Sequence, residues 1–161
     1  MMVGYTSAVM FLSEGIFMFA SKSLLNRFKA GRVIMISGVF FVLWQLLYSI
    51  VQAPWQIAGI ALLDGPSYAL FTIGVLYYLD ETAPEAIRTT YQTVTYAVYF
   101  GLSGIAGNFI GGRIITLYGF QNMYLFGAVL VMISIIFFFF LEKKLNRKEQ
   151  GYEQISYDNR S

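Results

Sequence analysis

The sequence contains no cysteine and no histidine. Without cysteine the chain can form no disulfide bond, no thiolate metal site and no thiol nucleophile. The absence of histidine removes the imidazole group, which is the usual general base and metal ligand near neutral pH. We therefore expect no metal ion and no cofactor, and catalysis that depends on either side chain is excluded.

Charge is also scarce, because only 12% of the residues are charged, whereas a soluble domain averages about 25%. Hydrophobic residues make up 57% of the chain and the mean hydropathy is +0.60. The net charge of +2 does not indicate a nucleic-acid partner, since the basic residues lie between and after apolar runs. The composition predicts an integral membrane protein whose first partner is the lipid bilayer.

Five apolar runs approach the roughly 20 residues that a helix needs to cross a bilayer. They predict an all-α fold, a polytopic transmembrane helix bundle over residues 1–142. A polar tail over residues 143–161 is expected to be disordered and cytoplasmic. The predicted spans are residues 4–25, 33–52, 55–79, 90–117 and 123–141.

The basic residues predict the orientation of these spans. Apart from Arg113, the lysines and arginines lie at the end of the first span (Lys22) or after the first, third or fifth span. Because such residues accumulate on the cytoplasmic side, we expect the N-terminus outside, the C-terminus inside, and the cell membrane as the location. Arg113 lies within the fourth span, and the sequence assigns it no role.

The third span contains an acid where an acid is costly. Asp64 is the only charged residue between Trp55 and Asp80, and its place near the bilayer midplane costs about 2.5–3.5 kcal/mol. Pro66 has no N–H group, so it leaves the carbonyl of Leu62 without its usual helical donor and favours a kink.

Glu14 is a second acid near the centre of a span. Either acid could be structural, held by hydrogen bonds to tyrosine, serine or the backbone. The cost of burying two acids favours a functional role over a structural one for Glu14 and Asp64. Intramembrane aspartyl catalysis would need two aspartates, so an enzyme is not expected.

Polar side chains at four-residue spacing are candidates for lining a cavity. They are Tyr68 and Thr72 in the third span and Tyr91, Thr95 and Tyr99 in the fourth. The tyrosines of the fourth span could equally be interfacial or packed aromatics.

The fourth span also carries glycines at spacings of three and four residues, which allow close helix packing. We expect this face to pack inside the bundle. The glycines are Gly101, Gly104, Gly107 and Gly111.

The segment LSEGIFMFASKSLLNRFKAGRVIMIS, residues 12–37, resembles the eighth helix and following loop of one branch of the major facilitator superfamily. That branch contains the lactose permease and the phenylpropionate permease. GLSGIAGNFIGGRIITLYGF, residues 101–120, is similar to the glycine-rich eleventh helix of the superfamily. The resemblance implies a solute transporter, often proton-driven. It matches Glu14 to an acid that takes part in substrate binding and proton coupling. It matches Asp64 to a position where those permeases carry a histidine, so an aspartate there changes the network of residues that couples transport to protons.

The resemblance covers about residues 4–142, equivalent to the last five helices of a twelve-helix transporter. It implies a small solute, protons and an N-terminal half of the transporter as partners. A fragment, a split gene and a mispredicted start all remain open. The alternative function is a non-transporting membrane interaction protein or a degenerate transporter remnant.

Overall fold

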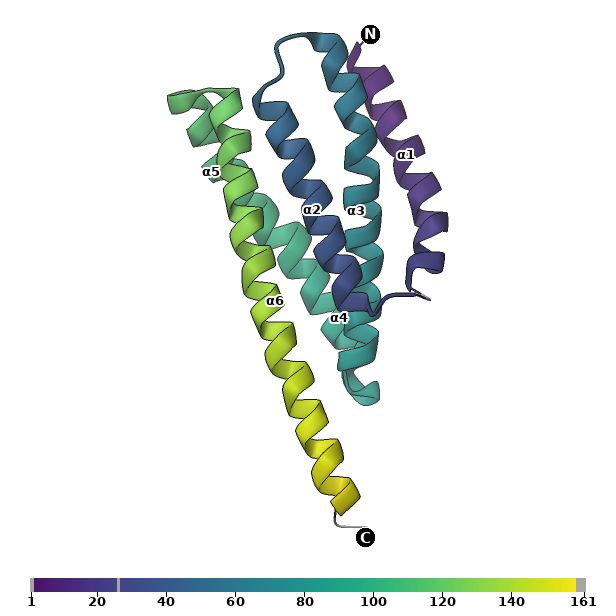
Figure 1. The fold of residues 1–161 in the computed structure, drawn as a ribbon. Helices are drawn as coiled ribbons and strands as arrows, with labels where there is room; N and C mark the ends of the chain where they lie inside the picture. The colour runs from purple at the N-terminus through teal and green to yellow at the C-terminus, as the bar shows by residue number, and fades with distance from the viewer. Residues whose placement is uncertain (1, 26, 159–161) are drawn as a thin grey trace.

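The computed structural model describes residues 2–25 and 27–158, with side chains for residues 7–21, 24–25, 27–53, 55–57 and 59–144. Every regular element in these ranges is helical, which confirms the predicted all-α fold. The elements, shown in Figure 1, are α1 (Met2–Leu25), α2 (Ala30–Ser49), α3 (Pro54–Thr82), the 3₁₀ turn η1 (Glu85–Ile87), α4 (Arg88–Tyr96), the π-helical η2 (Ala97–Leu102), α5 (Ser103–Tyr118) and α6 (Phe120–Asp158).

The packed part of the molecule is centred on α3, which lies between α1 and α2, while α2 also packs against α6 (Figure 1). Among the described residues, three stretches are long and apolar enough to cross a bilayer, Ala30–Ser49, Trp55–Thr82 and Phe120–Lys144. In α1 the apolar stretch is the shorter Ser7–Ser21. The chain is therefore an integral membrane protein.

Small side chains and glycines let these helices approach closely. A Cβ atom added at Gly74 of α3 would clash with Ile34 of α2, and one at Gly38 of α2 would clash with Ile135 of α6. At Gly127 of α6 an added Cβ would clash with the side-chain amide of Gln45. These contacts fix α2 between α3 and α6.

The fourth predicted span is not a uniform helix. The helical path is continuous from Arg88 to Tyr118, but residues 97–102 form a π-helical turn between α4 and α5. Both the backbone N–H and the hydroxyl of Ser103 donate to the carbonyl of Val98, five residues earlier. This wider turn has no counterpart in the expected single helix over residues 90–117.

The glycine face of this span does not pack inside the chain as we expected. A Cβ atom at Gly101, Gly104 or Gly107 would meet no atom within 4 Å, and at Gly111 it would make only an ordinary contact with Met123. Packing of this face within the bundle is therefore wrong for the first three glycines, because no helix among the described residues covers them.

The polar tail also differs from expectation. After Gly119, whose φ of 84° makes the turn that ends α5, α6 runs without a break to Asp158. The disorder expected for the tail is wrong up to that residue, and residues 159–161 lie outside the described part. Lysine, glutamate, leucine and arginine in the tail are strong helix formers, which accounts for the extension.

Candidate functional site

Helices α1 and α3 approach closely beside the proline of α3. Pro66 cannot donate to the carbonyl of Leu62, and the hydroxyl of Ser13 in α1 donates to this carbonyl instead, at 2.9 Å. A Cβ atom at Gly65 would clash with the Ser13 side chain and the backbone nitrogen of Glu14. Ser13 is 6% exposed, so it fills the gap between the helices.

This crossing brings the two predicted acids together. Glu14 follows Ser13 in α1, and Asp64 precedes Gly65 in α3. Both side chains are half-buried, and each carboxyl group lies within electrostatic range of the other. The sequence identified the two acids, but it gave no indication that they are neighbours or that Ser13 joins their helices.

Two tyrosines from other helices complete the surroundings of Asp64. Tyr48 of α2 and Tyr124 of α6 both lie within electrostatic range of its carboxyl group. Their rings stack with centroids 4.9 Å apart and an interplanar angle of 18°. Trp44 meets both rings edge-on, and its indole nitrogen is buried without a hydrogen-bond partner. Asp64 therefore faces an aromatic cluster formed by α2 and α6.

Tyr48 and Tyr124 were not among the residues expected at the site. The available signal was the choice of tyrosine over phenylalanine inside apolar runs, since a buried tyrosine hydroxyl usually has a polar neighbour. Without the fold, nothing distinguished these two from the other tyrosines in the chain.

The predicted lining residues fall into two groups. Tyr68 of α3 lies within electrostatic range of Glu14 and of Tyr96 in α4, and the Thr72 hydroxyl is buried one turn further along α3. Tyr91 is 49% exposed on α4. Thr95 and Tyr99 are half-buried. Tyr68 is therefore the lining residue for which an interaction with one of the two acids is observed.

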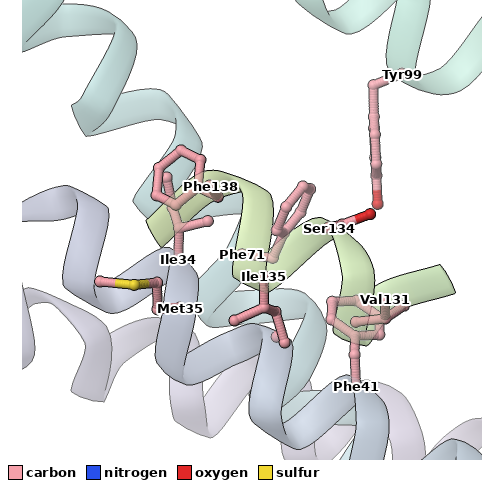
Figure 2. A pocket seen from close by; sticks show the side chains of 10 residues that line it. Ile34, Met35, Phe41, Phe71, Tyr99, Val131, Ser134, Ile135 and Phe138 are labelled. Carbon is pink, nitrogen blue, oxygen red and sulfur yellow. The ribbon is translucent and has the colours of Figure 1, made fainter. Parts of the chain in front are cut away.

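Tyr99 instead lines a separate apolar cavity of about 390 Å³ between α2, α3, η2 and α6. Figure 2 shows Phe71, Ile34 and Phe138 around this space, with the hydroxyls of Tyr99 and Ser134 on one side. No charged side chain lines it, so the chemistry of this cavity suits an apolar group.

A second cavity, of about 630 Å³, lies where α2 ends and α6 begins. Its lining includes Tyr48 and Tyr124 together with Gln121 and Asn122. Because the two tyrosines also border Asp64, this cavity adjoins the surroundings of the acid.

Cationic partners for the acids are not found within the described residues. Arg113 is exposed on α5, and the ion pair found in that part of the chain joins Asp80 and Arg88, with Nε and Oδ1 3.5 Å apart. The same residues contain no group of three or more acidic side chains placed to hold a metal ion. The chemistry of the site is that of two carboxyl groups and tyrosine hydroxyls.

Comparison with known proteins identifies the family. The sequence pattern of the MFS_1 like family matches residues 1–128. A maltose permease of Geobacillus stearothermophilus is 24% identical over 132 residues, covering 82% of this chain and 34% of the permease. No solved structure matches the chain.

Two proteins of Xenopus laevis are also similar. Major facilitator superfamily domain-containing protein 6-like protein A is 27% identical over 161 residues, covering 95% of this chain and 25% of its own length. Protein B of the same name is 24% identical over 160 residues, with the same coverage. The chain thus spans between a quarter and a third of the length of these relatives. Since the family pattern matches most of its residues, the chain belongs to the MFS_1 like family of the major facilitator superfamily.

Proposed function

We propose that this chain is the C-terminal part of a secondary active transporter that moves a small organic solute together with protons. The observation that supports the proposal is the pairing of Glu14 and Asp64 on α1 and α3, within electrostatic range and without an observed cationic partner in the described residues. Acids inside membrane helices are costly and mark ion or substrate paths. Transport, rather than catalysis, is the function that such a pair fits.

The pair offers a physical link between protonation and helix position. Two negative carboxylates on neighbouring helices repel one another, and a proton on either one removes the repulsion. Proton binding therefore changes the free energy of bringing α1 and α3 together beside Gly65. Transporters of this superfamily rely on the relative movement of helix bundles around a central site.

The test is to replace each acid by its neutral amide, Glu14→Gln and Asp64→Asn, in the longest protein encoded with this chain. Accumulation of solute against its gradient should fall at least about tenfold, while flux down the gradient continues, because the amide cannot carry the proton. Uptake is measured in both modes across a range of pH. Glu81→Gln, an exposed acid near the end of α3, is the matched control. Normal accumulation by both variants at every pH would rule out proton coupling through these acids.

The proposed orientation has the N-terminus outside and the tail cytoplasmic, in the cell membrane. It is supported by the positions of all lysines and arginines except Arg113. Reporter fusions at Gln121, in the first turn of α6, and after Lys144 should report opposite compartments. If both fusions report the same compartment, the orientation and the number of crossings are wrong.

The proposed partners are the N-terminal half of the transporter, the solute and protons. We place the chain in the branch of the lactose and phenylpropionate permeases because of the pattern around Glu14 and the basic loop after α1. The alternative is a membrane interaction protein without transport activity. It is favoured by the open glycines of α5, which leave a face that another helix can approach closely. An intact protein that binds no solute and shows neither mode of flux would support this alternative.

A further inference from the structure

The bond between Ser13 and the Leu62 carbonyl does more than fill a gap. In a bilayer a backbone carbonyl without a donor is costly, and Pro66 creates such a carbonyl in the middle of α3. In the described residues the donor comes from a different helix, 49 positions earlier in the chain. Ser21, Ser37, Ser49 and Ser67 also have buried hydroxyls, but each bonds to a carbonyl of its own helix.

The geometry points to Ser13 as a positioning residue, an interhelical latch that sets the register of α1 on α3 and thereby the approach of Glu14 to Asp64. Ser13 and Glu14 are adjacent in α1, and Leu62 and Asp64 are two residues apart in α3. A slide or rotation of α1 that breaks the bond therefore also changes the separation of the acids. Gly65 permits the approach on which the bond depends, because a Cβ atom there would clash with Ser13.

The latch has a property that an ordinary packing contact lacks. A side-chain hydroxyl can release the carbonyl and bond to its own helix, as the other buried serines do. Its release would leave the Leu62 carbonyl unpaired beside Pro66, so the separated state is disfavoured but accessible. The latch thus opposes separation of α1 and α3, and its effect on coupling rests on the function proposed above for Glu14 and Asp64.

The first experiment measures helix position without reference to transport. The chain has no cysteine, so Phe19→Cys on α1 and Leu76→Cys on α3, both exposed positions, can carry two spin labels in a lipid bilayer. Double electron–electron resonance should show a distance distribution that broadens measurably in Ser13→Ala. The control is Ser67→Ala, which removes a buried hydroxyl bonded within α3 and should leave the distribution unchanged. An unchanged distribution in Ser13→Ala overturns the latch.

A second variant tests the reason for the bond. Pro66→Ala restores a backbone N–H that can donate to the Leu62 carbonyl. In that background Ser13→Ala should lower the midpoint of thermal unfolding by less than it does beside Pro66. Equal shifts in the two backgrounds would mean that the serine does not compensate for the proline, which overturns the proposal.

The third readout connects the latch to the acids. In the longest protein encoded with this chain, Ser13→Ala should shift the pH profile of solute accumulation, while Ser67→Ala should not. A broadened distance distribution with an unchanged pH profile overturns the positioning role, provided that Glu14→Gln and Asp64→Asn alter accumulation. If those two variants are inert, the proposed proton coupling fails, and the distance and unfolding measurements still decide the latch.

Discussion

Two sets of glycines in this chain have opposite surroundings. In α3, Gly65 and Gly74 face atoms of neighbouring helices with which an added Cβ would clash. In the fourth span, Gly104 and Gly107 face open space. Spacing shows only that a helix can be approached closely. The residue that makes the approach, such as Ser13 opposite Gly65, decides whether the approach occurs within this chain.

The same contrast separates the helices by burial. In an 18-residue apolar window of α3, 39% of the residues are buried, whereas in the corresponding window of α6 6% are buried. No residue of α5 is buried. The bundle thus has a packed side built on α1, α2 and α3, and an outer side whose apolar side chains face lipid or another protein.

The largest expected difference in stability is between two glycine-to-alanine variants, one at a glycine that faces a neighbouring helix and one at a glycine that faces open space. Gly65→Ala should lower the free energy of unfolding by about 1–3 kcal/mol, because the new Cβ clashes with Ser13 and with the backbone of Glu14. Gly107→Ala should be neutral or stabilise the chain by up to about 1 kcal/mol, since alanine is the better helix former and the space is open. Denaturant unfolding of the 161-residue chain in lipid bilayers measures both.

The comparison fails if the two variants shift stability in the same direction by similar amounts. A loss of stability in Gly107→Ala would mean that a second copy of the chain covers this face in the bilayer. Repeating the measurement at several protein-to-lipid ratios separates that case, because association depends on concentration and folding within one chain does not.

Sequence alone was sufficient for the features that depend on composition and on the cost of burial in lipid. Long apolar runs predicted an all-α membrane bundle, and the cost of a buried acid drew attention to Glu14 and Asp64. The Ser13 bond was accessible in principle, because Pro66 was expected to free the Leu62 carbonyl and a freed carbonyl needs a donor. Choosing Ser13 among the serines of the chain required the register of α1 on α3, which no local pattern specifies.

Other features depended on interactions that a single helix does not encode. The π-helical turn at residues 97–102 uses the hydroxyl and backbone of Ser103, yet serine is common in membrane helices without such a turn. Tyr48 and Tyr124 come to Asp64 only because α2 lies between α3 and α6. The tail was taken as disordered from its polarity, whereas its helix-forming residues extend α6.

The smallest expected effect lies where the packed side joins the fourth span. Asp80 at the end of α3 pairs with Arg88 at the start of α4, with side chains 49% and 37% exposed. An exposed ion pair contributes about 0–1 kcal/mol and is weakened by salt. Asp80→Asn removes the charge and keeps an oxygen that can accept the hydrogen bond from Gln92, seen at 3.3 Å. We expect the free energy of unfolding to fall by less than about 1 kcal/mol at low salt, and this decrease should disappear at high salt. It is measured by the same unfolding assay, with Glu81→Gln as the control. A loss as large as that of Gly65→Ala, or one that salt does not reduce, would show that this junction holds the fourth span more firmly than its exposed surface indicates.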